Sequence, residues 1–336
     1  MQKIKIAVKN TIAYLLYYSG LLSLIKHYKL KNRVCVLAYH RVLPEEMLGK
    51  INSTSGIVTD SNLFRKHLSW LKQEFQIIGM EEMNGILANP EKQISNGCLV
   101  TFDDGWRDNY LYARSLLEQE GIPATIFLPY NYIDSGEVFW QEELLARLSL
   151  LNDSGEEPDK LFLQELTGYE GKTDKYQLRG YITGLKSKTY SEINAILDSL
   201  RSYQKDRPIT LEHDSYLTWD QVSDMEASNI SFGSHAMTHR ILTKIDPEDA
   251  RHEISASKAM LEKQIGKAVD TIAYPNGNSN RAVENMVAES DYKLGFTISP
   301  GYVSKDSNSM ALPRFNIHSN NSRNKPILLC TILQIF

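Results

Sequence analysis

Short apolar segments that end in polar residues alternate along the chain with amphipathic segments, and this alternation restricts the possible folds most. Residues 33–42, 97–104 and 123–130 are typical of buried strands, and residues 61–75 and 109–121 are typical of helices. Strands separated by helices of this length run parallel, with the helices as crossover connections. This part of the chain therefore predicts a parallel sheet that is covered by helices.

The strand and helix alternation stops at about residue 141 and resumes after residue 215. The intervening segment contains amphipathic helices joined by polar connectors, which indicates a helical insertion in one larger domain. We therefore expect an α/β, barrel-like domain over residues 33–320, with an N-terminal segment 1–32 and a C-terminal tail 321–336. In such barrels the chemistry gathers at the carboxyl ends of the strands.

The N-terminal segment "MQKIKIAVKNTIAYLLYYSGLLSLIKHYKLKNR" has an apolar middle, of about 14 residues, that is short for a transmembrane helix. Basic residues on both sides and the lack of a small-x-small cleavage site disfavour secretion, so a cytoplasmic or membrane-associated location is expected. The apolar residues that fall close to one helical face are Ile4, Val8, Ile12, Leu15, Leu22 and Ile25. Two interpretations stay open: a helix on an anionic membrane surface, and a helix packed on the domain.

The overall charge excludes some classes of partner. The net charge is -4, with 23% charged residues and 42% hydrophobic residues, as in an ordinary globular protein. There is no basic excess that would favour nucleic acid, and the sequence offers no sign of an obligate protein partner.

Polar residues lie at the ends of four predicted strands: His40, the Asp103–Asp104 pair, His235 with His239, and the segment 274–277. Each has an ordinary structural explanation when taken alone, such as a helix cap or a buried histidine. Because parallel strands end at one edge, we expect these groups to lie together. Two imidazoles four residues apart, on the first turn of a helix, would face the same ion.

Two adjacent carboxylates at the end of a buried strand need a positive neighbour. A metal ion held by Asp104, His235 and His239 would supply that charge and keep positions open for water and substrate. Asp103 would then be free to act as a base on the water.

The motifs "TFDDG", "SHAMTH" and "YPNG", after a first strand ending in "YHRV", resemble the polysaccharide deacetylase family of NodB-homology carbohydrate esterases. The resemblance covers roughly residues 33–318, apart from the insertion. It implies a distorted (β/α)7 barrel, a divalent metal that is usually Zn²⁺, and removal of N-acetyl groups from a glycan or polysaccharide. It also implies the same roles for Asp103 as base and for Asp104, His235 and His239 as ligands.

The sequence departs from the family pattern in three places. "TIAYPNG" lacks the usual arginine before Pro275, and Arg314 is the candidate replacement that would brace Asp103. Asn276 stands where an aromatic residue is usual, although its backbone N–H, in the Tyr274–Pro275–Asn276 motif, can still bind an oxyanion. The late leucine–histidine motif is unclear, so the general acid is either His40, which we prefer, or His318.

The predicted function is metal-dependent release of acetate from a glycan. Two alternatives are a hydrolase of another C–N bond, such as a cyclic amide or imide, and a non-catalytic glycan-binding module on the same fold. Tyr130, Trp140 and Trp219 are candidates for stacking on sugar rings, with core packing as the alternative for each.

Overall fold

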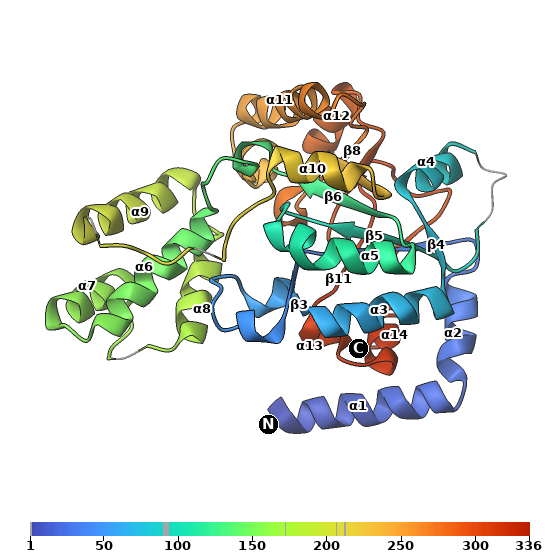
Figure 1. The fold of residues 1–336 in the computed structure, drawn as a ribbon, viewed down its shortest axis with the longest axis horizontal. Helices are drawn as coiled ribbons and strands as arrows, with labels where there is room; N and C mark the ends of the chain where they lie inside the picture. The colour runs from blue at the N-terminus through green and yellow to red at the C-terminus, as the bar shows by residue number, and fades with distance from the viewer. Residues whose placement is uncertain (1, 90–93, 172, 206, 212) are drawn as a thin grey trace. The chain divides into compact units, whose positions relative to one another are not determined.

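The computed structural model describes residues 2–89, 94–171, 173–205, 207–211 and 213–336, and its centre is one curled sheet (Figure 1). The strands follow the order β10-β1-β5-β6-β7-β8-β9, with β11 beside β1 and β4 beside β5. All their pairings are parallel except that of β10 with β1. The strands of this sheet are β1 (Val34–Tyr39), β4 (Gln76–Ile78), β5 (Gly97–Phe102), β6 (Ala124–Leu128), β7 (Ile230–Ser234), β8 (Thr271–Ala273), β9 (Leu294–Phe296), β10 (Tyr302–Val303) and β11 (Phe315–Asn316). The predicted α/β class with a mainly parallel sheet is confirmed.

Helices cover this sheet, and a second small sheet joins β2 (Arg41–Leu43) to β3 (Val58–Asp60) (Figure 1). All six residues of β1 and all six of β5 are buried, as expected for central parallel strands with both faces covered. The helices of this part are α3 (Ser61–Glu74), α4 (Met80–Ala88), α5 (Arg114–Glu120), α10 (Trp219–Glu226), α11 (Pro247–Ile265), α12 (Arg281–Glu289), α13 (Ser319–Ser322) and α14 (Lys325–Ile332).

The helix predicted over residues 109–121 is interrupted at its start. Residues Asn109–Ala113 form a π-helical turn, and a regular α-helix follows as α5 and ends at Gly121, with φ 64°. The buried Asn109 side chain donates to the carbonyl oxygen of His40 at 2.7 Å. The widened turn thus serves to hold the backbone at the end of β1.

Residues 49–54 and 135–215 form a separate compact unit with its own hydrophobic core. Its helices are α6 (Trp140–Ser154), α7 (Glu157–Thr167), α8 (Lys175–Leu185) and α9 (Tyr190–Gln204). Asp174 and Thr189 cap α8 and α9 with capping boxes. The Trp140 side chain is partly buried and packs against this core.

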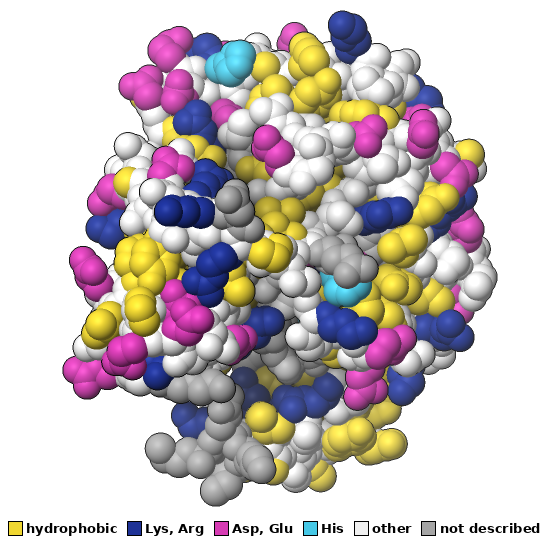
Figure 2. Space-filling model, turned by 60° about the vertical axis from the view of Figure 1, so that its left-hand side comes forward, with side chains coloured by type: hydrophobic (Ala, Val, Ile, Leu, Met, Phe, Trp, Pro, Cys, Tyr) yellow, Lys and Arg dark blue, Asp and Glu magenta, His cyan; other side chains and the backbone are white. Residues whose placement is uncertain are grey.

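The N-terminal segment forms two helices, α1 (Gln2–Tyr18) and α2 (Leu21–Lys29), and α1 packs against α14. Among the described residues, no helix is both long and apolar enough to cross a bilayer. Figure 2 shows hydrophobic and basic side chains side by side at the lower edge of the molecule, at the height of α1 in Figure 1. The C-terminal residues Ile327–Cys330 are buried in the same compact unit as the sheet.

Candidate active site

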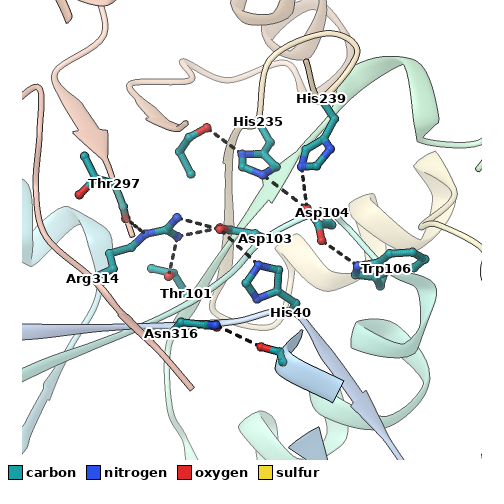
Figure 3. Close-up of polar contacts among 12 residues, drawn as sticks. His40, Thr101, Asp103, Asp104, Trp106, His235, His239, Thr297, Arg314 and Asn316 are labelled. Atoms are coloured by element: carbon teal, nitrogen blue, oxygen red, sulfur yellow. Dashed lines mark hydrogen bonds and ion pairs between the residues drawn. The ribbon is translucent and has the colours of Figure 1, made fainter. Parts of the chain in front are cut away.

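Three potential metal ligands meet at the carboxyl ends of β5 and β7, the two neighbours of β6 (Figure 3). The ligand atoms of Asp104, His235 and His239 all lie within 4.8 Å of one another. Asp104 Oδ1 is 3.4 Å from His235 Nε2 and 3.3 Å from His239 Nε2. The sequence therefore identified residues that the fold does bring together.

The donor set fits a divalent cation, because at least one imidazole is already oriented for it. His235 Nδ1 lies 2.7 Å from the carbonyl oxygen of Ala273, which can only accept, so Nδ1 carries the proton. The Nε2 lone pair of His235 then faces Asp104 and His239, as in metal-binding histidines with a fixed outer partner. Two nitrogens and one carboxylate leave coordination positions for water and substrate.

The expectation that His235 and His239 lie on the first turn of a helix was wrong. Residues 235–241 form a loop, with Ala236 and His239 in the left-handed region at φ 63° and 57°. Glu253 of α11, which is only 3% exposed, accepts from Met237 N at 2.9 Å and Thr238 N at 2.8 Å, and also from Thr238 Oγ1. These N–H groups are satisfied by a carboxylate from α11 instead of by carbonyls of a helical turn.

We expect Glu253→Gln to weaken metal binding by roughly 10- to 100-fold, the usual effect of altering a group that orients metal ligands. The amide oxygen can still accept from the two loop N–H groups, but the NH₂ group then faces Thr238 Oγ1 and Arg240 Nε, which donate to the second carboxylate oxygen of Glu253. Competition with a chelator measures this change. Glu248→Gln, an exposed position at the start of the same helix, is the matched control. Equal metal affinity in both variants would exclude Glu253 from holding the loop.

Arg314 contacts Asp103 at two points. Its NH1 and NH2 groups donate to Oδ1 and Oδ2 of Asp103, both at 2.7 Å, and its Nε donates to the Thr297 carbonyl at 2.8 Å (Figure 3). Arg314 is fully buried and precedes β11, which pairs with β1 beside β5. Burial raises the pKa of the Asp103 carboxyl, but the Arg314 guanidinium reverses this, and the net pKa lies below its usual value. Asp103 is therefore held as an oriented carboxylate.

Asp104 is held differently. Trp106 Nε1 donates to its Oδ2 at 2.9 Å, so Oδ1 faces the two histidines. Burial raises the pKa of Asp104, but the neighbouring imidazoles of His235 and His239 bring the net pKa well below its usual value. The turn needs Gly105, with φ 64°, where a Cβ would meet Leu128 Cδ2 at 2.9 Å.

Trp106 and Glu253 are site residues that sequence reasoning missed. Trp106 is buried and stacks on Tyr216, with ring centroids 4.6 Å apart. Its position two residues after Asp104 in "DDGW" was the available signal. For Glu253, the signal was a carboxylate on the buried face of α11, beside Ile254.

Of the two candidate acids, His40 lies nearer to Asp103. His40 Nε2 is 3.9 Å from Asp103 Oδ2, and its buried Nδ1 has no hydrogen-bond partner among the described residues. Burial lowers the pKa of His40, against the opposing effect of Asp104 and Asp103. Burial and the charge of His40 also lower the pKa of His318. Both imidazoles are therefore biased toward the neutral form, and their roles remain predictions.

The segment 274–277 divides between the core and the surface. Tyr274 is fully buried and donates to the Met310 carbonyl at 2.6 Å, and Pro275 is also buried. Asn276 is exposed in the left-handed region, with φ 57° and ψ 8°. The Tyr274 side chain thus belongs to the core, and within this motif only the backbone at Asn276 stays a candidate oxyanion donor.

The three aromatic residues predicted to stack on sugar rings lie in two different places. Tyr130 and Trp219 are partly buried neighbours, with ring centroids 5.4 Å apart. Tyr130 N donates to Ala236 O at 3.2 Å, which places this pair beside the histidine loop. Trp140 instead contributes to the core of the helical unit.

Comparisons of the sequence with family models and with curated proteins both find polysaccharide deacetylases. A family model described as polysaccharide deacetylase matches residues 172–295. A Bacillus subtilis protein with the name "Putative polysaccharide deacetylase YxkH" is 22% identical over 276 residues, covering 82% of this chain and 71% of that protein.

Solved structures show the same fold. The deacetylase PplD of Streptococcus pyogenes, solved with acetate, is 21% identical with a TM-score of 0.60, over 90% of this chain and 99% of PplD. IcaB of Ammonifex degensii is 17% identical with a TM-score of 0.58, over 90% of this chain and 97% of IcaB. The resemblance found in the sequence motifs is therefore confirmed: the chain is similar in sequence to polysaccharide deacetylases, and it shares the fold of the solved deacetylases.

Proposed function

We propose that this protein is a metal-dependent hydrolase that removes N-acetyl groups from a glycan, with Zn²⁺ as the cation. The observation that carries the proposal is the different surroundings of two adjacent acids. Asp103 is gripped by Arg314, and Asp104 faces two histidines. One carboxylate is thus suited to proton transfer and the other to ligation.

Asp104, His235 and His239 would hold the cation. When bound, it would lower the pKa of a coordinated water toward about 7 and polarise the acetyl carbonyl. Asp103 takes a proton from the attacking water, while Arg314 keeps the carboxylate oriented. The Asn276 backbone N–H is proposed to donate to the oxyanion that forms at the carbonyl.

His40 is proposed to deliver the proton to the leaving amine. A neutral imidazole beside Asp103 can take up the proton that Asp103 has received and pass it on. The new C–O bond and the broken C–N bond leave acetate and a free amine. The proton that Asp103 takes from water ends on the leaving nitrogen, and the second proton of that water is released when the acetic acid product ionises to acetate.

The relatives support a glycan substrate, and so does the Tyr130–Trp219 pair beside the histidine loop, which is suited to a sugar face. We expect the purified protein to release acetate from N-acetylglucosamine oligomers, and a chelator to abolish the release until metal is restored. Binding of the oligomers without acetate release would favour a glycan-binding module. Hydrolysis of a cyclic imide alone would favour the other C–N hydrolase.

Arg314→Lys is expected to reduce turnover strongly and to raise the pKa of the acid limb of the pH–rate profile. A lysine keeps the charge but cannot hold both carboxylate oxygens and the Thr297 carbonyl. Asp103 must be ionised to act as the base, so activity is lost as pH falls through its pKa. With Arg314 that pKa lies below the ordinary value of about 3.9, and without the guanidinium it moves upward.

The pH–rate profile of Arg314→Lys is compared with that of Arg251→Lys, a surface arginine that pairs with Glu289. An acid limb that coincides in the two variants would remove Arg314 as the brace of Asp103.

A further inference from the structure

The outward side of α1 and α2 exposes more large apolar side chains than the rest of the described chain. Eight of the thirteen large hydrophobic residues that are exposed in the described ranges lie between residues 8 and 28. They are Val8, Ile12, Tyr14, Leu15, Tyr18, Leu21, Leu24 and Tyr28. Leu15 is 66% exposed and Tyr18 is 79% exposed, so these side chains are not shielded by neighbouring parts of the chain.

The opposite side of the same helices is attached to the folded domain. Ala13, Leu22 and Leu30 are buried, and α1 packs against α14. Lys26 pairs with Glu74, and Lys29 donates to the Leu333 carbonyl at 2.6 Å. Packing on the domain therefore uses one side of α1 and α2, and no described residue covers the other, apolar side.

The charge of this segment is opposite to that of the protein as a whole. Residues 1–33 contain seven Lys and Arg residues and no Asp or Glu, whereas the full chain has a net charge of -4. Lys5, Lys31 and Arg33 are exposed. An exposed apolar strip with basic residues nearby is the pattern of a helix that lies in a lipid interface.

We propose that α1 and α2 dock the protein on a bilayer surface that contains anionic lipids. Val8, Leu15, Tyr18 and Leu24 would enter the boundary between headgroups and acyl chains, and the lysines would contact the acidic headgroups. A second copy of the chain is a poorer occupant, because two copies of this face would bring two basic segments together. The proposal is independent of the hydrolase reaction, since it uses none of the active-site residues.

The test is co-sedimentation of the full-length protein with vesicles of phosphatidylcholine alone and with added phosphatidylglycerol. We expect binding to the anionic vesicles, weaker binding at high salt, and little binding to phosphatidylcholine alone. Leu15→Glu should lower the partition coefficient by roughly tenfold or more, because it removes a leucine that would enter the bilayer and adds a charge that anionic headgroups repel. Lys5→Gln and Lys31→Gln should each lower it roughly fivefold.

Leu161→Glu, at a leucine 58% exposed in α7, is the matched control and should bind as the wild type does. Circular dichroism and acetate release report whether each variant keeps its fold. Equal binding of Leu15→Glu and Leu161→Glu to anionic vesicles would overturn the proposal. A protein that ignores vesicles but forms dimers, which Leu15→Glu separates in light scattering, would assign the face to self-association and overturn it as well.

Discussion

Asp103→Asn is expected to reduce acetate release by roughly 100- to 10,000-fold, the usual contribution of a positioned general base. The amide can still contact Arg314 at one oxygen, but it cannot accept a proton from the attacking water. The metal ligands Asp104, His235 and His239 are untouched, so metal content should stay at the wild-type level. Steady-state turnover and metal analysis of the same sample check both expectations.

Asp220→Asn, an exposed position in α10, is the matched control for that experiment. A loss of metal in Asp103→Asn would show that Asp103 helps to hold the ion. Turnover close to that of the control would end its assignment as the base.

Removal of a metal ligand should be as damaging, but by a different route. His239→Ala is the cleanest choice, because its side chain is 15% exposed and its loss disturbs the core least, whereas His235 also holds the Ala273 carbonyl. We expect His239→Ala to lose most bound metal and essentially all acetate release, since two remaining ligands cannot retain the ion. Asp104→Ala and His235→Ala should do the same, at a greater cost in stability.

Elemental analysis after dialysis measures the metal content of these variants. His252→Ala, an exposed histidine of α11, is the control for the loss of an imidazole as such. Full stoichiometry in any one of the three ligand variants would remove that residue from the ligand set.

Several parts of the fold and site were predictable because their causes are local. Asp60 caps α3 through Leu63 N, and the periodic apolar residues Phe64, Leu68 and Leu71 define its buried face. The polar ends of β5 and β7 meet because parallel strands share a direction, which needs only the order of the elements. The proximity of Arg314 to Asp103 has no local cause, and it was predicted from the resemblance, because the arginine that usually precedes Pro275 is missing.

Other parts depended on contacts that no local pattern encodes. Spacing alone allowed a helical turn at His235 and His239, but Glu253 binds the intervening N–H groups and keeps a loop there. The π-turn at Asn109 coincides with a hydrogen bond from its side chain to His40, 69 residues away in the sequence, which no local pattern predicts. The inclusion of residues 49–54 in the helical unit also depends on distant partners, such as Asn52 with Asp214.

The pairing of the first strand, β1, with the last one, β11, affects the order in which the protein folds. β1 takes β5 on one side and β11 on the other, and the brace of Asp103 arrives with β11, 211 residues after the acid it holds. Closing so long a loop is slow compared with forming the local strand and helix pairs. During synthesis, Asp103 therefore lacks its contact with the Arg314 guanidinium until nearly the whole chain has emerged. If Arg314 braces the base as we propose, we expect hydrolytic activity to be a late result of folding and a chain that ends before residue 314 to be inactive.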